Sequence, residues 1–290
     1  MAPDQQAHLK LAVQKSPQEV GIDLANWNWK VAREFIHERF GLMLTRSSCL
    51  NYLHRLGFVL KRPKKRLLKA KAADREAFVA SYATLRLEAQ AKGAKIFFAD
   101  EAHFRADADL RGKWVLKGLP ALVDSTSPRW GAKASYYSAV CLETGEVEVM
   151  ELEGNSTAQT SAAFLRQMRT NHREPLVVIW DNAPAHRGEA IRSYLSSPDL
   201  NLLLVALPTY SPDFNGDEAI WNWAREDVTA NTCLGTKAKV QEKLGEFFDG
   251  LVERTEEVKL RCRTELQARA DALMMTVAQP EHVVPTLALV

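Results

Sequence analysis

Apolar residues near the start of the chain recur with the period of short helices. One predicted helix has Asn26 as its cap, ends at Gly41, and carries apolar side chains at helical spacing at Trp29, Val31, Ala32, Phe35 and Ile36. A second begins at Thr45 or Ser47, ends at Gly57, and has Leu50, Leu53 and Leu56 on one face. The pattern therefore predicts two helices joined by a Gly-containing turn. Pro63 separates them from a longer helix over about residues 72–91.

From Lys95 onward, short apolar runs replace the helical spacing. They predict strands at residues 96–99, 136–140, 146–152, 176–180 and 202–207, with Thr144-Gly145 as a turn. Helical patterns cover residues 160–170 and 186–195, and another helix opens at Asp217. Two amphipathic helices are expected over residues 236–273. The alternation predicts a mixed α/β layer domain behind an all-helical N-terminal region.

Composition excludes several classes of protein. The chain has 46% hydrophobic and 26% charged residues, as ordinary globular proteins do. No run of 18 apolar residues could span a membrane, and the N-terminus lacks the apolar core of a secretory signal. The cysteines Cys49, Cys141, Cys233 and Cys262 lie far apart, which argues against a zinc site or a disulfide framework. We therefore expect a protein of the reducing cytoplasm.

The formal net charge of +2 hides two opposed regions. Through Lys92 the chain carries 17 basic and 8 acidic residues, a net +9, whereas the remainder carries 21 and 28, a net −7. The positive charge peaks over residues 61–71, where 7 of 11 residues are cationic. A basic N-terminal part on an acidic body indicates a nucleic-acid-binding region joined to a domain with another task.

The helix pair fits that interpretation, because its second helix has polar and basic side chains off the apolar face. As a helix-turn-helix, this pair would place that helix in a DNA major groove. The candidate DNA contacts are Arg46, Asn51, His54 and Arg55 on the helix and Lys61, Arg62, Lys64, Lys65 and Arg66 in the basic run. Helix pairs also occur in proteins that never meet DNA, and a basic run can be a solvated linker, so both alternatives stay open here.

Three acidic residues stand where elements of the predicted body begin or end. Asp100 and Asp181 follow buried apolar strands, and Glu218 lies at the start of a helix. Each one alone could be a solvated end residue. Adjacent strands of one sheet, however, can bring the two aspartates to the same edge, and a helix across that edge can add the glutamate. Clustered carboxylates repel unless a cation lies between them, and their hard oxygens suit Mg²⁺ or Mn²⁺.

The segments around these acids resemble a known family. Residues 98–101 (FADE), 178–186 (VIWDNAPAH) and 207–215 (LPTYSPDFN), followed by Glu218 and Trp221, are similar to the ordered blocks of mariner-superfamily DDE transposases. The resemblance is to the bacterial insertion-sequence branch, the IS-six-thirty group, and extends from about Ser16 to Arg263. It implies an RNase H-like fold, two divalent metal ions, and cut-and-paste DNA transposition into TA sites.

Carried over residue by residue, the resemblance makes Asp100, Asp181 and Glu218 the catalytic metal ligands. Asn182, His186 and Asp217 are possible supporting residues, and Asp217 is a neighbouring candidate for the third ligand. Relatives often have Asn-Pro-Ile-Glu where this chain has Asn215-Gly216-Asp217-Glu218. The partners expected are double-stranded DNA, as transposon ends and target, and a second copy of the chain in a homodimer on DNA. A nucleotide cofactor is not expected, because the chain has no GxxxxGK[ST] phosphate loop.

The resulting organisation has four parts. Residues 1–60 form the helix-turn-helix domain, 61–92 a basic linker and connecting helix, 93–235 the catalytic domain with an insertion at about 105–133, and 236–290 C-terminal helices and a tail. Trp114 in the insertion either contributes to protomer contacts, as that region does in relatives, or packs as an anchor on the body.

Relatives usually carry another upstream helix-turn-helix, which this chain is expected to lack. A catalytically silent DNA-binding regulator or remnant is therefore the alternative to an active enzyme of the bacterial cytoplasm and nucleoid.

Overall fold

The computed structural model of the protein describes residues 1–61, 71–126 and 132–278. The chain divides into two compact units, Met1–Arg66 and Leu67–Val290. The basic-run residues Arg62, Lys64, Lys65 and Arg66 lie outside the described residues. In the part of the chain that is described, no helix is both long and apolar enough to cross a membrane.

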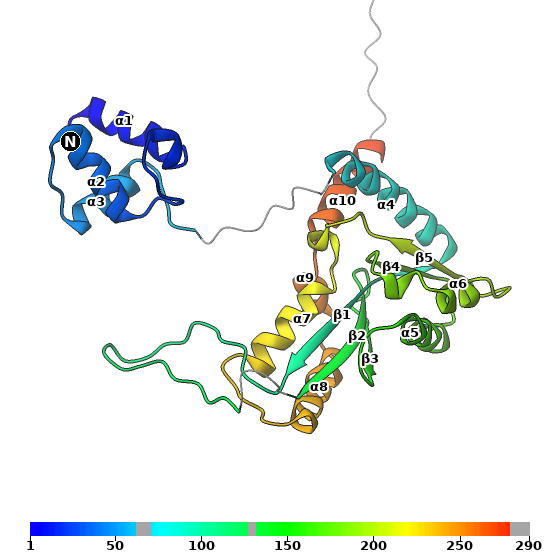
Figure 1. Ribbon diagram of the computed structural model, residues 1–290. Helices are drawn as coiled ribbons and strands as arrows, with labels where there is room; N and C mark the ends of the chain where they lie inside the picture. The colour runs from blue at the N-terminus through cyan, green and yellow to red at the C-terminus, as the bar shows by residue number, and fades with distance from the viewer. Residues whose placement is uncertain (62–70, 127–131, 279–290) are drawn as a thin grey trace, which may run out of the picture. The chain divides into compact units, whose positions relative to one another are not determined.

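The first unit is built from helices α1 (Pro3–Val13), α2 (Trp29–Phe40) and α3 (Arg46–Arg55), with a short 3₁₀ turn at Gln18–Val20 (Figure 1). The helix-turn-helix prediction is confirmed for α2 and α3. Their apolar faces share one small core with α1, made of Leu9, Ala12, Ala32, Phe35, Ile36 and Cys49. Helix α1 was not predicted, because only Leu9 and Ala12 of its residues are fully buried.

Helix ends in this unit follow local chemistry. The cap of α2 is Asn28 and not Asn26, since the Asn28 side chain accepts hydrogen bonds from the backbone N–H groups of Lys30 and Val31. Thr45 caps α3 by accepting from the Ser48 N–H. Gly41 ends α2 with a φ of 67°, a left-handed conformation that favours glycine.

The second unit contains a five-stranded sheet in the order β3-β2-β1-β4-β5. The strands are β1 (Lys95–Arg105), β2 (Lys133–Cys141), β3 (Val147–Leu152), β4 (Leu176–Trp180) and β5 (Leu202–Ala206). β1, β2 and β3 pair antiparallel, whereas β4 pairs parallel with both β1 and β5. This is the predicted mixed sheet with flanking helices, an RNase H-like arrangement.

One strand differs from its prediction. The sequence suggested a strand that stops at Asp100, but β1 continues to Arg105. Its last residues alternate between buried and exposed side chains because one face, with Ala102 and Phe104, covers the core. Asp100 therefore lies within β1 rather than at its tip. The parallel pairing of β1 with β4 ends at Phe98 and Ile179. Asp100 therefore still lies just beyond the last residue of β1 that pairs with β4.

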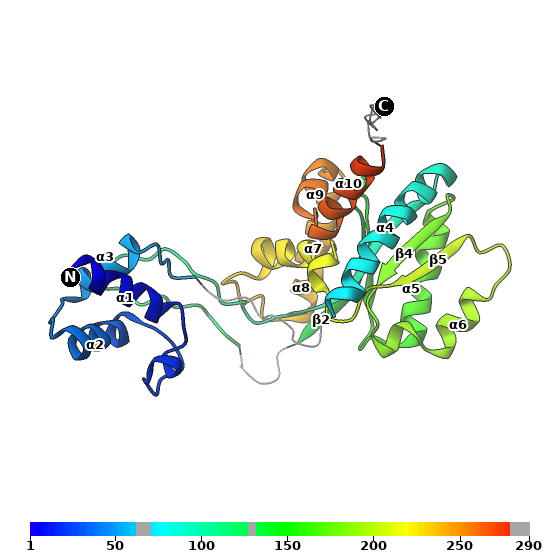
Figure 2. The ribbon, with the colours of Figure 1, turned by 90° about the horizontal axis from the view of Figure 1, so that it is seen from above.

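Helices cover both faces of the sheet (Figures 1 and 2). On one face α5 (Ala158–Asn171) and α6 (Glu189–Leu195) bury a core around Trp180 and Tyr137. The other face is covered by α4 (Ala72–Lys92), α7 (Glu218–Ala224), α8 (Lys237–Leu251), α9 (Thr255–Arg261) and α10 (Glu265–Ala278). The C-terminal stretch thus forms three helices where two were predicted. Because α4 and α8–α10 share one core with the sheet, the finer division into residues 93–235 and 236–290 stays a prediction.

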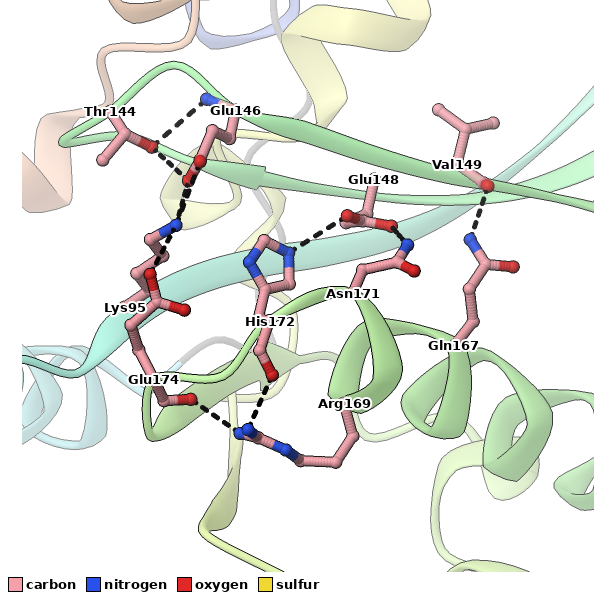
Figure 3. A network of polar contacts seen from close by, with 10 residues as sticks. All are labelled: Lys95, Thr144, Glu146, Glu148, Val149, Gln167, Arg169, Asn171, His172 and Glu174. Atoms are coloured by element: carbon pink, nitrogen blue, oxygen red, sulfur yellow. Dashed lines mark hydrogen bonds and ion pairs between the residues drawn. The ribbon is translucent and has the colours of Figure 1, made fainter.

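A polar network fastens the C-terminal end of α5 to the sheet (Figure 3). His172 contacts Glu148 of β3 at 3.0 Å, and the Lys95 ammonium at the start of β1 lies 2.9 Å from Glu146 and 3.2 Å from Glu174. Arg169 donates to the backbone carbonyls of His172 and Glu174. These bonds fix the turn that leads into β4, and hence the direction in which β4 delivers Asp181.

The predicted insertion lies between β1 and β2. Its described residues, 106–126, contain no regular strand, and Asp109 joins the segment to the body by hydrogen bonds with Thr229 and Asn231. The side chain of Trp114 is fully exposed, which excludes an anchor packed on the body. Leu110, Leu116 and Leu122 are exposed as well.

Candidate active site

Asp100, Asp181 and Glu218 line one pocket of about 590 Å³. Phe98 pairs with Ile179 in the parallel ladder, and each aspartate comes two residues later, so the two occupy equivalent positions on neighbouring strands. Neighbouring strands run about 4.8 Å apart, which brings the two backbones close. Glu218, the first residue of α7, completes the set. The structure thus brings together the three acids that the sequence singled out.

The electrostatics of the pocket reflect this crowding. Burial raises the pKa of Asp100 to about 7, and the neighbouring carboxylates of Glu218, Asp181 and Glu101 add to the shift, while a backbone hydrogen bond at Glu101 opposes it. Burial also raises the pKa of Glu218, against the opposing effect of Arg225. Negative charge in this pocket is therefore unfavourable until something positive neutralises it.

Asp181 is held by one of its two carboxylate oxygens. Its Oδ1 accepts a hydrogen bond from the Ala183 N–H at 2.9 Å and lies 3.3 Å from Nε2 of His186. The His186 ring is buried, stacks on Trp180 with centroids 3.9 Å apart, and contacts Ser161 Oγ through Nδ1 at 3.1 Å. This arrangement fixes Asp181 through Oδ1 and leaves Oδ2 for another partner.

Asp217 and Glu218 have different surroundings. Asp217 is completely buried, accepts a hydrogen bond from the Ser138 hydroxyl, and does not line the pocket. Ser138 pairs with Asp100 across β1 and β2, so Asp217 lies beneath that carboxylate. Burial and the nearby Asp100 raise the pKa of Asp217 well above its usual value. Glu218, not Asp217, shares the pocket with the two aspartates.

Asn215 connects the two halves of the site. Its buried side chain donates to the carbonyl of Ala99, next to Asp100, and accepts from the N–H of Asp217, next to Glu218. The following Gly216 is tightly enclosed, because a Cβ there would lie 2.7 Å from Leu142 Cδ2 and 3.0 Å from the Cys262 carbonyl oxygen. The close approach explains locally why glycine follows Asn215.

The loop before α7 also lines the pocket. Tyr210 has a φ of 61°, an uncommon backbone conformation for a residue with a side chain. The Ser211 hydroxyl is buried and has no hydrogen-bond partner among the described residues. The burial of this hydroxyl was not predicted, although the Tyr210-Ser211-Pro212 block marked the loop.

Other predicted residues fall into separate places. Asn182 lines the pocket and donates to the Leu207 carbonyl. In the first unit, the predicted DNA contacts of α3 and the first residue of the basic run are exposed: Arg46, Asn51, His54, Arg55 and Lys61. Signals for Ser138 and Ser161 as supporting residues were absent from the local sequence, since their partners lie far away in the chain. Asn215 stood inside a quoted block, but its contact with Ala99 spans 116 residues.

The donor chemistry of the pocket fits a hard divalent cation, because three carboxylates face a shared space and repel one another. The unpaired Oδ2 of Asp181 and the unpartnered Ser211 hydroxyl provide further oxygen atoms. Within the described residues, the conformation holds no group of three His, Cys, Asp or Glu side chains close enough to surround one ion. A cation would therefore draw these side chains inward.

Comparisons with known proteins define the class of this site. Residues 95–241, half of the chain, match the DDE superfamily endonuclease family, and residues 25–82 match a winged helix-turn-helix family. The chain belongs to the DDE superfamily endonuclease family, and it is an enzyme of that nuclease class. A search of curated proteins gave no match.

Solved structures share the fold. The mariner Mos1 paired-end complex with Mg has a TM-score of 0.66 at 16% identity, covering 97% of this chain and 82% of that one. The Mos1 transposase paired-end complex with left transposon end has a TM-score of 0.63 at 17% identity, covering 95% and 80%. The Mos1 paired-end complex with Mn has a TM-score of 0.61 at 16% identity, covering 93% and 80%.

Proposed function

We propose that this protein is a cut-and-paste DNA transposase that hydrolyses phosphodiester bonds at transposon ends and transfers the 3′ ends into TA target sites. The observation that carries the proposal is the placement of Asp100, Asp181 and Glu218 around one pocket in a chain of the DDE endonuclease family. Similarity in fold to Mos1 complexes with transposon ends and to a Mos1 strand transfer complex supports it. The motif blocks favour the bacterial IS-six-thirty branch and action on DNA in the bacterial cytoplasm and nucleoid.

In this mechanism Asp100, Asp181 and Glu218 would hold two divalent cations, Mg²⁺ or Mn²⁺. When bound, these ions supply the charge that activates a water or 3′-hydroxyl and stabilises the departing oxygen of the phosphodiester. The Ala183 N–H and His186 fix the Oδ1 atom of Asp181, so its Oδ2 would be available to bind a cation. The Mg and Mn complexes of Mos1 support the choice of cations.

The first unit would bind the transposon ends. The exposed side chains of α3, including Asn51 and Arg55, face solvent as a recognition helix requires. Lys61 and the basic residues after it would follow the phosphate backbone.

The exposed apolar residues of the insertion, Trp114 and Leu116, support a homodimer on DNA with this segment at the protomer contact. Replacing both by Ser should lower the mass of the DNA complex, measured by light scattering, from two chains to one.

The test of catalysis is Mn²⁺-dependent cleavage of a plasmid that carries the DNA flanking the gene on both sides. Wild type should release the flanked segment and insert it at TA sites, which sequencing of the junctions would show. Asp181→Asn should abolish both steps and still bind DNA. If wild type and Asp181→Asn cut equally, or if neither cuts while both bind, the catalytic proposal fails and the silent DNA-binding regulator is the better description.

A further inference from the structure

Three cationic side chains surround the indole ring of Trp29 in the first unit. The Lys30 Nζ atom lies 5.8 Å from the ring centroid, and the Cζ atoms of Arg33 and Arg46 lie at 5.3 and 5.5 Å. Trp29 is the first residue of α2 and Arg46 the first residue of α3. The Cys49 thiol of α3 also donates to the Trp29 carbonyl. The starts of both helices therefore meet at this ring.

These cations are not neutralised. None of the three forms an ion pair with a carboxylate anywhere in the described ranges, and this includes Asp23 and Glu34, the acids nearest in sequence. The ring attracts each cation only weakly at an exposed site. The N-termini of two helices add partial positive charge at the same place. The cluster is a concentration of positive charge that lacks an anion.

A second tryptophan in the chain provides an internal contrast. Arg254 and Arg261 each lie 4.2 Å from the ring of Trp223, which is buried. Both of these arginines are paired with Glu257, at 2.8 and 2.9 Å, and Arg261 also lies 3.8 Å from the carboxylate of Glu226. The Trp223 cluster is therefore neutral and serves packing, whereas the Trp29 cluster, on a partly exposed ring, carries its charge without a partner.

We propose that Trp29, Lys30, Arg33 and Arg46 form a binding site for a backbone phosphate of duplex DNA. In a helix-turn-helix the first helix crosses the DNA backbone while the second enters the groove, and helix N-termini favour phosphate oxygens. The site would sit beside the groove that α3 reads, so it fixes the register of the protein on DNA without reading bases. Arg46 then contacts phosphate rather than a base, and base reading falls to the exposed Asn51, one helical turn further along α3.

This inference rests on the DNA binding in the proposed function. The test uses the full-length protein and compares wild type with Lys30→Gln/Arg33→Gln/Arg46→Gln, which removes charge but keeps chain length. Arg39→Gln, in the last turn of α2, is the matched control because Arg39 is also exposed. Binding to a 30-base-pair duplex of random sequence is measured by fluorescence anisotropy from low to high salt, with circular dichroism as the check on folding.

The slope of log K against log salt should fall by about 0.9 for each phosphate contact that is lost. We expect the slope of the triple variant to fall by at least the amount of one phosphate contact, and we expect this variant to bind every duplex more weakly. Arg39→Gln should keep the wild-type slope. A wild-type slope in the triple variant would overturn the phosphate site, as would tighter binding to an RNA duplex of the same length. Trp29→Phe, which keeps an aromatic ring, should retain the slope that Trp29→Leu reduces.

The two proposals fail in different ways. An unchanged slope with Asp181-dependent cleavage rejects only the phosphate site at Trp29. A reduced slope with cleavage that does not depend on Asp181 rejects only the catalytic assignment. Absence of any duplex binding by wild type rejects both.

Discussion

Asn215 donates a hydrogen bond from its Nδ2 atom to the carbonyl oxygen of Ala99 at 2.9 Å, across 116 residues of sequence. Through its Oδ1 atom the same side chain accepts from the Asp217 N–H at 3.1 Å. One buried amide thereby joins the strand residue before Asp100 to the helix residue before Glu218. The separation of two proposed metal ligands depends on this side chain.

Replacing Asn215 by Asp should therefore weaken metal-dependent cleavage while the protein stays folded. The carboxylate can still accept a hydrogen bond from the Asp217 N–H, but it cannot donate one to the Ala99 carbonyl. The start of α7 is then no longer held at a fixed distance from β1. Supporting residues around metal sites typically contribute about 10–100-fold in metal affinity or activity. The measurement is the cleavage rate as a function of Mn²⁺ concentration. Asn171→Ala, an exposed amide bonded to Glu148, is the control. Equal Mn²⁺ dependence in Asn215→Asp and wild type would contradict the positioning role.

The contact between His186 and Asp181 makes a second prediction. His186→Phe keeps an aromatic ring to stack on Trp180 but removes the contact with Oδ1 of Asp181. Asp181 would then rotate more freely, and cleavage should need about 10–100-fold more metal. Ser161→Ala removes the contact with Nδ1 of His186 and a contact with the Tyr137 hydroxyl but leaves the contact between His186 and Asp181 in place, so its effect should be smaller. Metal titrations of cleavage with the two variants would show this order, and a larger effect of Ser161→Ala would argue against it.

The third acid can be identified by comparing Glu218→Gln with Asp217→Asn. Glu218 lines the pocket, so its neutral amide should abolish cleavage even though the side chains are similar in size. Asp217 is buried against Ser138, and its amide can keep that hydrogen bond by accepting from the hydroxyl. We expect Asp217→Asn to reduce cleavage far less. Cleavage assays at saturating Mn²⁺ decide between them, and the reverse order would make Asp217 the ligand.

Much of the body could be predicted from sequence because buried strands have a strong local signature. The run Leu176 to Trp180 is apolar throughout, and it forms the fully buried β4. The extension of β1 beyond Asp100 had a weaker signal, the alternation of buried Ala102 and Phe104 with more exposed neighbours. The break between α9 and α10 had none from Gly or Pro, so the C-terminal region was predicted with one helix too few.

The supporting contacts of the site could not be predicted from local sequence. Ser138 and Asp217 are 79 residues apart, and Asn215 and Ala99 are 116 apart. Such pairs depend on strand order and register, which hydrophobic periodicity does not specify. The three acids were found because each follows an apolar run or opens a helix inside a recognisable block. Their partners are ordinary polar residues whose importance comes only from what they touch.

The burial of Asp100 and its repulsion by Glu218 and Asp181 predict opposite effects of one substitution with and without metal. Asp100→Asn removes a buried negative charge, so the metal-free protein should unfold at a higher temperature than wild type. Wild type should gain stability when Mn²⁺ is added, by about 2.7 kcal/mol at 100 times Kd, because the ion binds only the folded chain. The variant should gain much less. Thermal unfolding with EDTA and with Mn²⁺ measures both effects, and equal Mn²⁺ stabilisation in the two proteins would exclude Asp100 as a ligand.

The ion pair between Arg75 and Asp213 predicts a loss of stability in acid. Arg75 donates two hydrogen bonds to the Asp213 carboxylate, at 3.0 and 2.6 Å, and these bonds hold the pKa of Asp213 below its usual value. Since the folded-state pKa is depressed, the pair stabilises the fold above the unfolded value of about 3.9, and this contribution disappears as pH falls through the lower, folded-state pKa. Asp213 is half exposed, so the contribution should be below about 1 kcal/mol.

Asp213→Asn should therefore lower the free energy of unfolding at pH 7, and its effect should shrink as pH falls through the depressed pKa of Asp213, where wild type loses the same charge. Urea unfolding of both proteins at several pH values measures the difference. Asp199→Asn, another exposed aspartate of the second unit and one without an ion pair among the described residues, is the control. A difference between Asp213→Asn and wild type that stays constant as pH falls through the aspartate range would show that the Asp213 side chain stabilises α4 by packing rather than by its charge.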